Sequence, residues 1–323
     1  MARYGVIDLG SNTIRLVIYD VKETGKHTFC AKDFKRTVNE KEMAGLAAFV
    51  QDGVFTETGI KRAVSVLKTH AKHAAYFDCK RTDVFATAVL RNAANCAEAV
   101  AAIEARTGLA ITLLSERDEA HLGFVGAASS ANLTRGTLID IGGGSTELSR
   151  IEGGRDYDDV SIGQGSLSSF ARFVRGITPA PFEMDAIACS FRSHLKALGN
   201  PERYRCEVLY GVGGSARAAA KVVAQIKGLE SRPRTVSAED IAGVLAACKE
   251  DPNAFGHAAL KASAERVHTI VPGCVILDTL CKQLGATRLE ICKYGVREGY
   301  LIERMLGGTS VAPGAADTAG AQN

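Results

Sequence analysis

The stretch Leu138-Ile-Asp-Ile-Gly-Gly-Gly-Ser-Thr-Glu-Leu148 joins an apolar strand to three consecutive glycines and places a carboxylate on either side of them. Leucine and isoleucine favour extended backbone, whereas glycines permit positive φ and expose successive N–H groups. A ring of such donors can bind phosphate oxygens. Asp140 and Glu147 would repel a phosphate unless a hard cation lay between them, and Mg²⁺ is the usual ion there. The stretch predicts an anion site with Mg²⁺; a plain glycine hairpin turn is the alternative.

A second stretch, Val6 to Tyr19 (VIDLGSNTIRLVIY), repeats this shape near the N-terminus. Both have two apolar residues, an aspartate, an apolar residue, a glycine with small polar residues, and then a second apolar strand. Asp8 and Asp140 are 132 positions apart (140 − 8). Internal repetition of this kind indicates two similar lobes. We expect each lobe to present an Asp-Gly turn to a shared cleft.

A third glycine turn, Tyr210-Gly-Val-Gly-Gly-Ser215, follows the apolar residues Val208 and Leu209 and precedes an alanine-rich helical stretch, Ala216 to Ile226. This order places the turn at the N-terminus of a helix. Backbone N–H groups and the helix dipole both favour an anion at that position. The sequence therefore predicts a second group of phosphate-binding amides.

Composition excludes several classes of protein. The chain has 323 residues, of which 46% are hydrophobic and 23% charged, as in a globular protein with two ordinary domains. The net charge of +3 is too small for a nucleic-acid binder that acts through the charge of a whole domain. Nine cysteines, with no C-x-x-C pair, indicate reduced thiols and a cytoplasmic protein. No apolar run predicts a signal peptide or a membrane span.

Alternating strand and helix patterns predict an α/β fold. We expect lobes over residues 1–122 and 123–306, with a helix at about 294–306 that packs back on the first lobe. Residues 307–323 are rich in glycine, alanine and small polar residues, and they predict a flexible tail.

Three charged residues of the first lobe are candidates for chemistry. Arg15 lies on the return strand of the first repeat, and Arg91 lies at a strand-to-helix junction, so either can contact phosphate or remain an ordinary surface arginine. Glu119 lies in the first turns of a helix that Ser115 and Asp118 cap. It is a candidate general base, or one more acid favoured by the helix dipole. His70 and His73 share a helix without a suitably spaced carboxylate or cysteine, which favours surface residues over a metal site.

The motifs, in this order, resemble the Ppx/GppA family of exopolyphosphatases and guanosine pentaphosphate phosphohydrolases, within the actin, sugar-kinase and Hsp70 superfamily. The resemblance spans residues 3–306. The matching segments are Asp8-Leu-Gly-Ser-Asn-Thr-Ile-Arg15, Ala86-Thr-Ala-Val-Leu-Arg-Asn-Ala-Ala-Asn95, Asp140-Ile-Gly-Gly-Gly-Ser-Thr-Glu147, Gly211-Val-Gly-Gly-Ser215 and Tyr294-Gly-Val-Arg-Glu-Gly299.

The resemblance implies two ribonuclease-H-like lobes around a cleft and Mg²⁺-dependent removal of a terminal phosphate. The family's catalytic glutamate falls on Glu119, although Glu116 and His121 replace a glycine and an arginine of the family pattern. The metal ligands expected on this basis are Asp140, Glu147 and Asp8. The expected phosphate-binding residues are Ser11, Asn12, Arg15, Arg91, Gly142, Gly143, Gly144, Ser145, Gly213, Gly214 and Ser215.

The substrate expected is inorganic polyphosphate, and pppGpp is the alternative for the same chemistry. A long polyphosphate needs only a phosphate-lined groove, whereas a guanosine needs a base pocket that the sequence does not identify. A superfamily kinase would need ATP, and no sugar site is recognisable. A non-catalytic polyphosphate or nucleotide sensor is the alternative from another class, because Glu116 and His121 depart from the family pattern. A homodimer is consistent with the resemblance.

Overall fold

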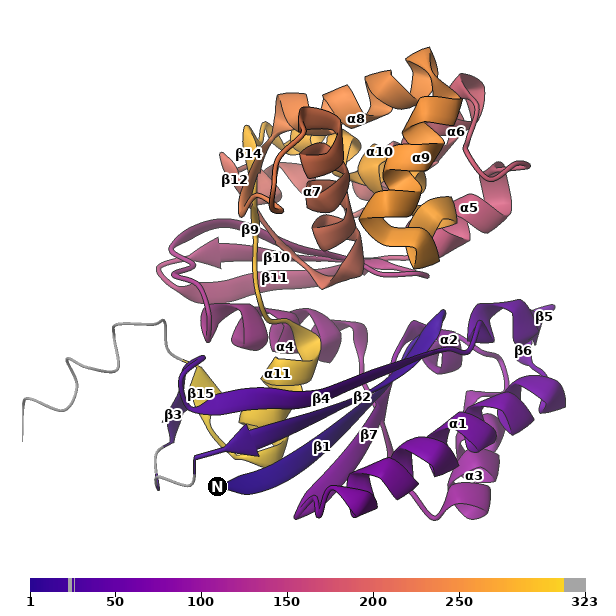
Figure 1. Ribbon diagram of the computed structural model, residues 1–323, viewed down its shortest axis with the longest axis vertical. Coiled ribbons are helices and arrows are strands. Elements are labelled where there is room, and N and C mark those ends of the chain that lie inside the picture. The colour runs from indigo at the N-terminus through magenta and orange to yellow at the C-terminus, as the bar shows by residue number, and fades with distance from the viewer. Residues whose placement is uncertain (23–24, 26, 311–323) are drawn as a thin grey trace, which may run out of the picture. The chain divides into compact units, whose positions relative to one another are not determined.

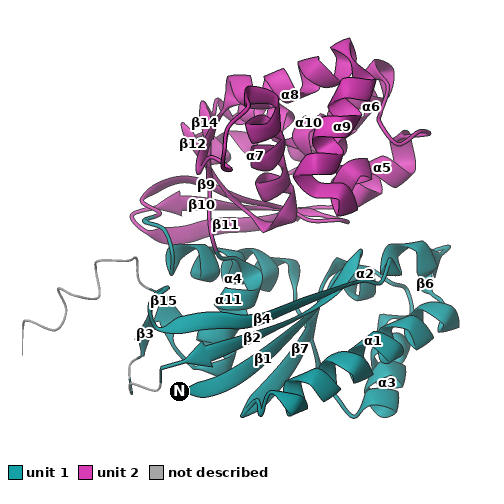
Figure 2. Cartoon of the chain, in the orientation of Figure 1, with its two compact units in different colours: residues 1–132, 294–323 teal, residues 133–293 magenta. Residues whose placement is uncertain are grey.

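The structure is a computed structural model that describes residues 1–22, 25 and 27–310. The chain divides into two compact units, one formed by residues 1–132 with 294–323 and the other by residues 133–293 (Figure 2). The segment that follows the second unit in the sequence thus belongs to the first unit. The boundary expected at residues 122–123 falls inside helix α4, Glu116–Ala128, which belongs whole to the first unit.

The first unit is built on a five-stranded sheet in the order β4-β2-β1-β7-β8, of which Figure 1 labels β4, β2, β1 and β7. Strands β1, β2 and β4 are antiparallel neighbours, whereas β7 and β8 run parallel to β1. The strands of this sheet are β1 Ala2–Leu9, β2 Thr13–Val21, β4 Phe34–Met43, β7 Arg81–Ala86 and β8 Ile111–Leu113. The helices are α1 Glu57–Tyr76, α2 Ala88–Arg91, α3 Cys96–Thr107, α4 Glu116–Ala128, α11 Val296–Tyr300, η1 Leu46–Phe49 and η4 Leu301–Met305.

The two faces of this sheet have different contents. Ile7, Leu9 and Leu16 pack with helices α1 and α3 in the hydrophobic core of the unit. Because side chains alternate along a strand, Asp8 and Arg15, which are paired across β1 and β2, face the other way. Helices α4 and α11 lie on that second side (Figure 1). The charged residues of the hairpin are therefore kept out of the main core.

The second unit repeats this topology. Its sheet has the order β11-β10-β9-β12-β14-β13, in which β13 is added to an arrangement equivalent to that of the first unit. The strands are β9 Arg135–Ile141, β10 Thr146–Glu152, β11 Arg155–Ile162, β12 Val208–Val212, β13 Thr235–Ser237 and β14 Arg288–Ile291. The helices are α5 Ser166–Phe173, α6 Pro181–Ala197, α7 Gly213–Lys227, α8 Ala238–Glu250, α9 Pro252–Ser263, α10 Val267–Leu284, η2 Pro201–Tyr204 and η3 Ala264–Arg266.

The repeat seen in the sequence is a structural repeat. The β1–β2 hairpin pairs Asp8 with Arg15, and the β9–β10 hairpin pairs Asp140 with Glu147. Both pairs are separated by the same number of residues and both point away from the main core of their own unit. The predicted α/β fold with two ribonuclease-H-like lobes is confirmed.

The expected tail differs in detail from the structure, because part of it pairs with a short strand. That strand is β3, Thr28–Phe29. Of the tail expected at 307–323, Thr309–Ser310 form β15, which pairs with β3 in parallel, and residues 311–323 lie outside the described residues. Composition does not predict this pairing because its partner lies far away in the sequence. The remaining short strands, β5 Val50–Gln51 and β6 Val54–Phe55, form a separate hairpin.

Helices α4 and α11 approach each other through glycines. A Cβ atom added to Gly126 of α4 would lie 1.9 Å from the carbonyl oxygen of Gly295, and one added to Gly299 of α11 would lie 1.9 Å from that of Leu122. Neither helix leaves room for a methyl group at the crossing. The backbone of α11 therefore fixes the position of α4, which carries Glu119.

We expect Gly126→Ala to lower the free energy of unfolding by about 1–3 kcal/mol, because an added methyl group overpacks this contact. Gly243→Ala is the matched control. Gly243 lies in helix α8, where an added Cβ meets nothing within 4 Å, so higher helix propensity should stabilise the protein by up to about 1 kcal/mol. Urea unfolding measures both. Equal shifts for the two variants would contradict the close α4–α11 contact.

Candidate functional site

In the second unit, Asp140 and Glu147 face each other across the β9–β10 hairpin. They are direct partners in the antiparallel register, so their side chains lie on the same side of the sheet. Glu147 is 4% exposed, and the Ser161 hydroxyl donates to its Oε1 at 2.9 Å. Two carboxylates placed opposite each other repel unless a cation or a proton lies between them. The arrangement therefore suits a bound cation.

The turn between these strands contains Gly142, Gly143, Gly144 and Ser145. The Gly142 amide donates to the Ser145 carbonyl at 2.9 Å, which closes the turn. In the described part of the chain, the Gly143 and Gly144 amides have no backbone acceptor. The carbonyls of Gly142 and Gly143 instead accept from the N–H groups of residues 166–168 at the start of α5. These hydrogen bonds hold the turn in place, and the amides of Gly143 and Gly144 remain available for an anion.

The third glycine turn begins helix α7, as the sequence predicts. A Cβ atom on Gly213, whose φ is +76°, would lie 2.0 Å from Oδ1 of Asp140. The Asp140 carboxylate thus lies directly against the first turn of α7. The Ser215 hydroxyl donates to the Ile141 carbonyl at 2.7 Å, which ties α7 to strand β9. The structure therefore brings Asp140, Glu147 and the two predicted groups of glycines together within one unit.

The sequence interpretation missed one cation at this place. Arg266 immediately precedes helix α10, and a Cβ atom on Gly214 would lie 2.1 Å from its Nη2 atom. The guanidinium therefore lies against the first turn of α7, where anion binding is also favoured by the helix dipole. No motif marks Arg266, because the chain brings it back from a distant helix.

A left-handed backbone alone costs a non-glycine residue roughly 1–2 kcal/mol. We expect Gly213→Ala to lower the free energy of unfolding by more than this, because the added Cβ atom also displaces Asp140. Gly228→Ala separates the two effects. Gly228 ends the same helix at φ +65° and an added Cβ there meets nothing within 4 Å. Urea unfolding should show a larger loss of stability in Gly213→Ala than in Gly228→Ala. If the two variants behave alike, the contact with Asp140 is unimportant.

In the first unit, Glu119 lies in the first turn of α4, on a helix start that Ser115 caps. Arg91 is its partner: Nη1 donates to Glu119 Oε2 at 2.8 Å and to the Leu114 carbonyl at 3.1 Å. The two side chains are only 14% and 12% exposed. The structure thus joins two residues that the sequence assigned separately.

Arg91 retains donors after this pairing. Its Nε and Nη2 atoms are buried and donate to no hydrogen-bond acceptor among the described residues, while Nη2 lies 4.0 Å from a carboxylate oxygen of Glu116. These two N–H groups form the edge of a guanidinium that matches two phosphate oxygens. Arg91 can therefore hold Glu119 with one side and bind an anion with the other.

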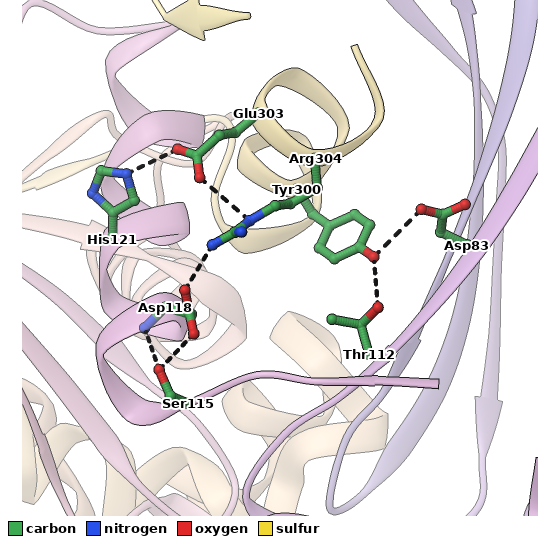
Figure 3. Close-up of polar contacts among 8 residues, drawn as sticks. All are labelled: Asp83, Thr112, Ser115, Asp118, His121, Tyr300, Glu303 and Arg304. Atoms are coloured by element: carbon green, nitrogen blue, oxygen red, sulfur yellow. Dashed lines mark hydrogen bonds and ion pairs between the residues drawn. The ribbon is translucent and has the colours of Figure 1, made fainter. Parts of the chain in front are cut away.

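The start of α4 is held by a polar network within the first unit (Figure 3). Asp118 accepts from the Ser115 hydroxyl at 2.6 Å and from Arg304 of η4 at 2.7 Å. His121, one of the departures from the family pattern, contacts Glu303 of η4 at 2.9 Å. Hydrogen bonding to Ser115 and the nearby Arg304 charge lower the pKa of Asp118. The network fixes the helix that carries Glu119, and it gives His121 a partner of its own.

The β1–β2 hairpin carries the remaining predicted residues. Ser11 and Asn12 lie in its turn, and their carbonyls accept from Ala47 and Gly45. Arg15 lies opposite Asp8, and its Nη1 donates to Asn39 at 2.9 Å.

Asp8 has an ion-pair partner that the sequence did not predict. Arg297 of α11 donates to Asp8 Oδ2 at 2.9 Å. Burial raises the pKa of Asp8, and the charges of Arg297 and Arg15 oppose that shift. The sequence could have indicated Arg297 as a site residue, because it lies in the Tyr294–Gly299 segment that carries the resemblance. The role of Asp8 as a metal ligand stays a prediction, and the structure gives this carboxylate an arginine partner.

None of the helices in the described part of the chain combines the length and apolar character that crossing a bilayer requires.

Comparison with known proteins places the chain among phosphatases. Residues 26–307 match the model of the Ppx/GppA phosphatase family. Exopolyphosphatase 1 of Mycobacterium tuberculosis (strain ATCC 25618 / H37Rv) is 26% identical over 314 residues, which cover 94% of this chain and 88% of that protein. Exopolyphosphatase 1 of Mycobacterium leprae is 25% identical over 315 residues, with 94% and 89% covered.

Two solved structures share the fold. An exopolyphosphatase from Cytophaga hutchinsonii has a TM-score of 0.80 at 20% identity, with 95% of this chain and 99% of that chain covered. The Ppx/GppA family member from Aquifex aeolicus has a TM-score of 0.75 at 21% identity, with 95% and 98% covered. Because the family model matches most of the sequence, the chain belongs to the Ppx/GppA phosphatase family and is a phosphatase.

Proposed function

We propose that this phosphatase is an exopolyphosphatase, which hydrolyses the terminal phosphoanhydride of inorganic polyphosphate and releases orthophosphate. The observation that carries the proposal is the partly buried Arg91–Glu119 pair, which combines a fixed carboxylate with two unused guanidinium donors. The similarity to Exopolyphosphatase 1 along 94% of the chain supports the choice of substrate.

The reaction assigned to these residues is attack of water on the terminal phosphorus. Glu119 accepts a proton from the water while the oxygen of that water bonds to phosphorus. The bridging P–O bond then breaks, and the shortened polyphosphate leaves with the bond electrons. Arg91 holds the Glu119 carboxylate in its orientation, and its Nε and Nη2 groups donate to the phosphoryl oxygens. Phosphoryl transfer depends mostly on such positioning and on charge stabilisation.

Asp140 and Glu147 fit a divalent cation of the Mg²⁺ type. Their donors are all oxygen, they face each other across one hairpin, and Glu147 is almost fully buried. When bound, Mg²⁺ would neutralise phosphate charge. The Gly143 and Gly144 amides and the first turn of α7 add N–H donors for phosphate oxygens beside these carboxylates.

The same chemistry would convert pppGpp to ppGpp, which is the alternative substrate. Membership of a phosphatase family argues against the non-catalytic sensor. A polyphosphate chain requires only repeated phosphate contacts, and the donors of Arg91 and of the Gly143 and Gly144 amides suit such contacts.

Parallel assays of phosphate release from polyphosphate and from pppGpp, with and without Mg²⁺, test the proposal. We expect Mg²⁺-dependent release from polyphosphate with the higher kcat/KM. A higher kcat/KM for pppGpp would assign the enzyme to the alternative, and equal rates after removal of Mg²⁺ would refute the role of the cation.

A further inference from the structure

Two histidines of helix α1 meet a carboxylate of strand β4. His70 and His73 were predicted to be surface residues without a metal-binding partner, and this prediction is wrong for His70, whose side chain is 1% exposed. The missing carboxylate is Glu40, which is distant in sequence and reaches the helix because β4 is the edge strand that packs near α1. Ligand atoms of Glu40, His70 and His73 all lie within 4.8 Å of one another.

The two ring nitrogens of His70 have different surroundings. Its Nε2 atom lies 3.4 Å from the backbone carbonyl oxygen of Ile14, which can only accept a hydrogen bond. The proton of the neutral ring therefore belongs on Nε2, and Nδ1 carries the lone pair. Burial lowers the pKa of His70, which favours this neutral form. Metal-bound histidines typically donate their second nitrogen to such a carbonyl.

The lone pair of Nδ1 is left facing an acceptor. Nδ1 of His70 lies 3.7 Å from Oε1 of Glu40, and among the described residues it has no hydrogen-bond partner. His73 Nδ1 contacts the other oxygen of Glu40 at 2.6 Å, so a simple histidine–glutamate hydrogen bond accounts for His73 but not for His70. A cation between the three groups satisfies all of them.

We propose that Glu40, His70 and His73 form a binding site for a transition-metal ion of the Zn²⁺ class, separate from the phosphatase site. Imidazole ligands suit Zn²⁺, Ni²⁺ and Co²⁺ and disfavour Mg²⁺. Ligand atoms bound to one Zn²⁺ in tetrahedral geometry lie about 3.3 Å apart, and the spacing of His70 and Glu40 is close to this. Rotation of the Glu40 carboxylate opens the place for the ion.

The proposed site is open to solvent, and an ion bound there would have a structural role. The side chains of His73 and Glu40 are 45% and 35% exposed, so an ion can reach the site from solvent and keep a water as its fourth ligand. The ion would join α1 to β4, and through His70 to the carbonyl of Ile14, the neighbour of Arg15. The site therefore stabilises the edge of the sheet that carries the β1–β2 hairpin.

The test is calorimetric titration of Zn²⁺ into the untagged, chelator-treated full chain, with millimolar Mg²⁺ present to occupy oxygen-ligand sites. We expect one Zn²⁺ per chain. His73→Gln and Glu40→Gln each remove one ligand at a half-exposed position, so the protein should stay folded by circular dichroism while Zn²⁺ affinity falls at least about tenfold. Loss of the ligand should also remove the rise in Tm that Zn²⁺ causes.

Two controls separate this site from others. His257→Gln changes an exposed histidine on α9, and Glu147→Gln changes the proposed Mg²⁺ site, so both should bind Zn²⁺ with unchanged affinity. Failure of the unmodified chain to bind Zn²⁺, or equal affinity in the chain and in both ligand variants, would overturn the proposal. Loss of Zn²⁺ binding in Glu147→Gln would assign the ion to the phosphatase site instead.

Discussion

Glu119→Gln is expected to lower kcat for phosphate release from polyphosphate by about 10²–10⁴-fold, the usual contribution of a general base. Glutamine keeps the shape of the side chain and can still accept a hydrogen bond from Arg91 through its amide oxygen. It cannot take a proton from water at neutral pH. KM should change little, because Arg91 and the glycine amides still bind phosphate. Steady-state kinetics on polyphosphate give both values.

Glu116→Gln is the matched control for this change. Glu116 begins the same helix, but its side chain is 54% exposed and its carboxylate is 4.0 Å from Arg91. Its replacement should change kcat by no more than a few-fold. A folded Glu119→Gln protein that retains the rate of the unmodified enzyme would remove Glu119 from the mechanism, and a larger loss in Glu116→Gln would move the role to that residue.

Glu147→Gln is expected to raise the Mg²⁺ concentration needed for half-maximal activity by about 10–100-fold, the loss typical for changes around a metal ligand. The side chain is buried opposite Asp140, so glutamine removes one of the two charges that make the place attractive to a cation. The fold should persist, because the Ser161 hydroxyl can still donate to the amide oxygen. Phosphate release measured against Mg²⁺ concentration tests this expectation.

Glu152→Gln provides the comparison on the same strand. Glu152 ends β10 with its side chain 61% exposed, where it pairs with Arg150, and its loss should leave the Mg²⁺ dependence unchanged. If Glu147→Gln also leaves it unchanged, the cation is held elsewhere.

Local sequence was sufficient to predict the two hairpins and the start of α7. Each depends on residues close together in the chain: an apolar strand, an Asp-Gly turn and a return strand, or a strand followed by glycines and an alanine-rich helix. The register that sets Asp140 opposite Glu147 follows directly from the length of the turn. The structural repeat was visible for the same reason.

Partners that come from distant segments were not predictable in this way. Arg297 reaches Asp8 and Arg266 reaches the first turn of α7 only because later helices return to the sheet of their own unit. The pairing of Arg91 with Glu119 likewise depends on how α2 and α4 are placed. Glu40 was missed because the carboxylate was sought near His70 in sequence, whereas a neighbouring strand supplies it. The spacing of residues along the sequence does not predict contacts between distant segments.

Hydrolysis of polyphosphate by the purified chain in ¹⁸O-labelled water, with Mg²⁺, tests the central claim most directly. Attack of a water on the terminal phosphorus places one solvent oxygen in each orthophosphate released, and mass spectrometry should find this single label in the first turnover. No release of orthophosphate from polyphosphate under these conditions, or release without solvent oxygen, would contradict the account.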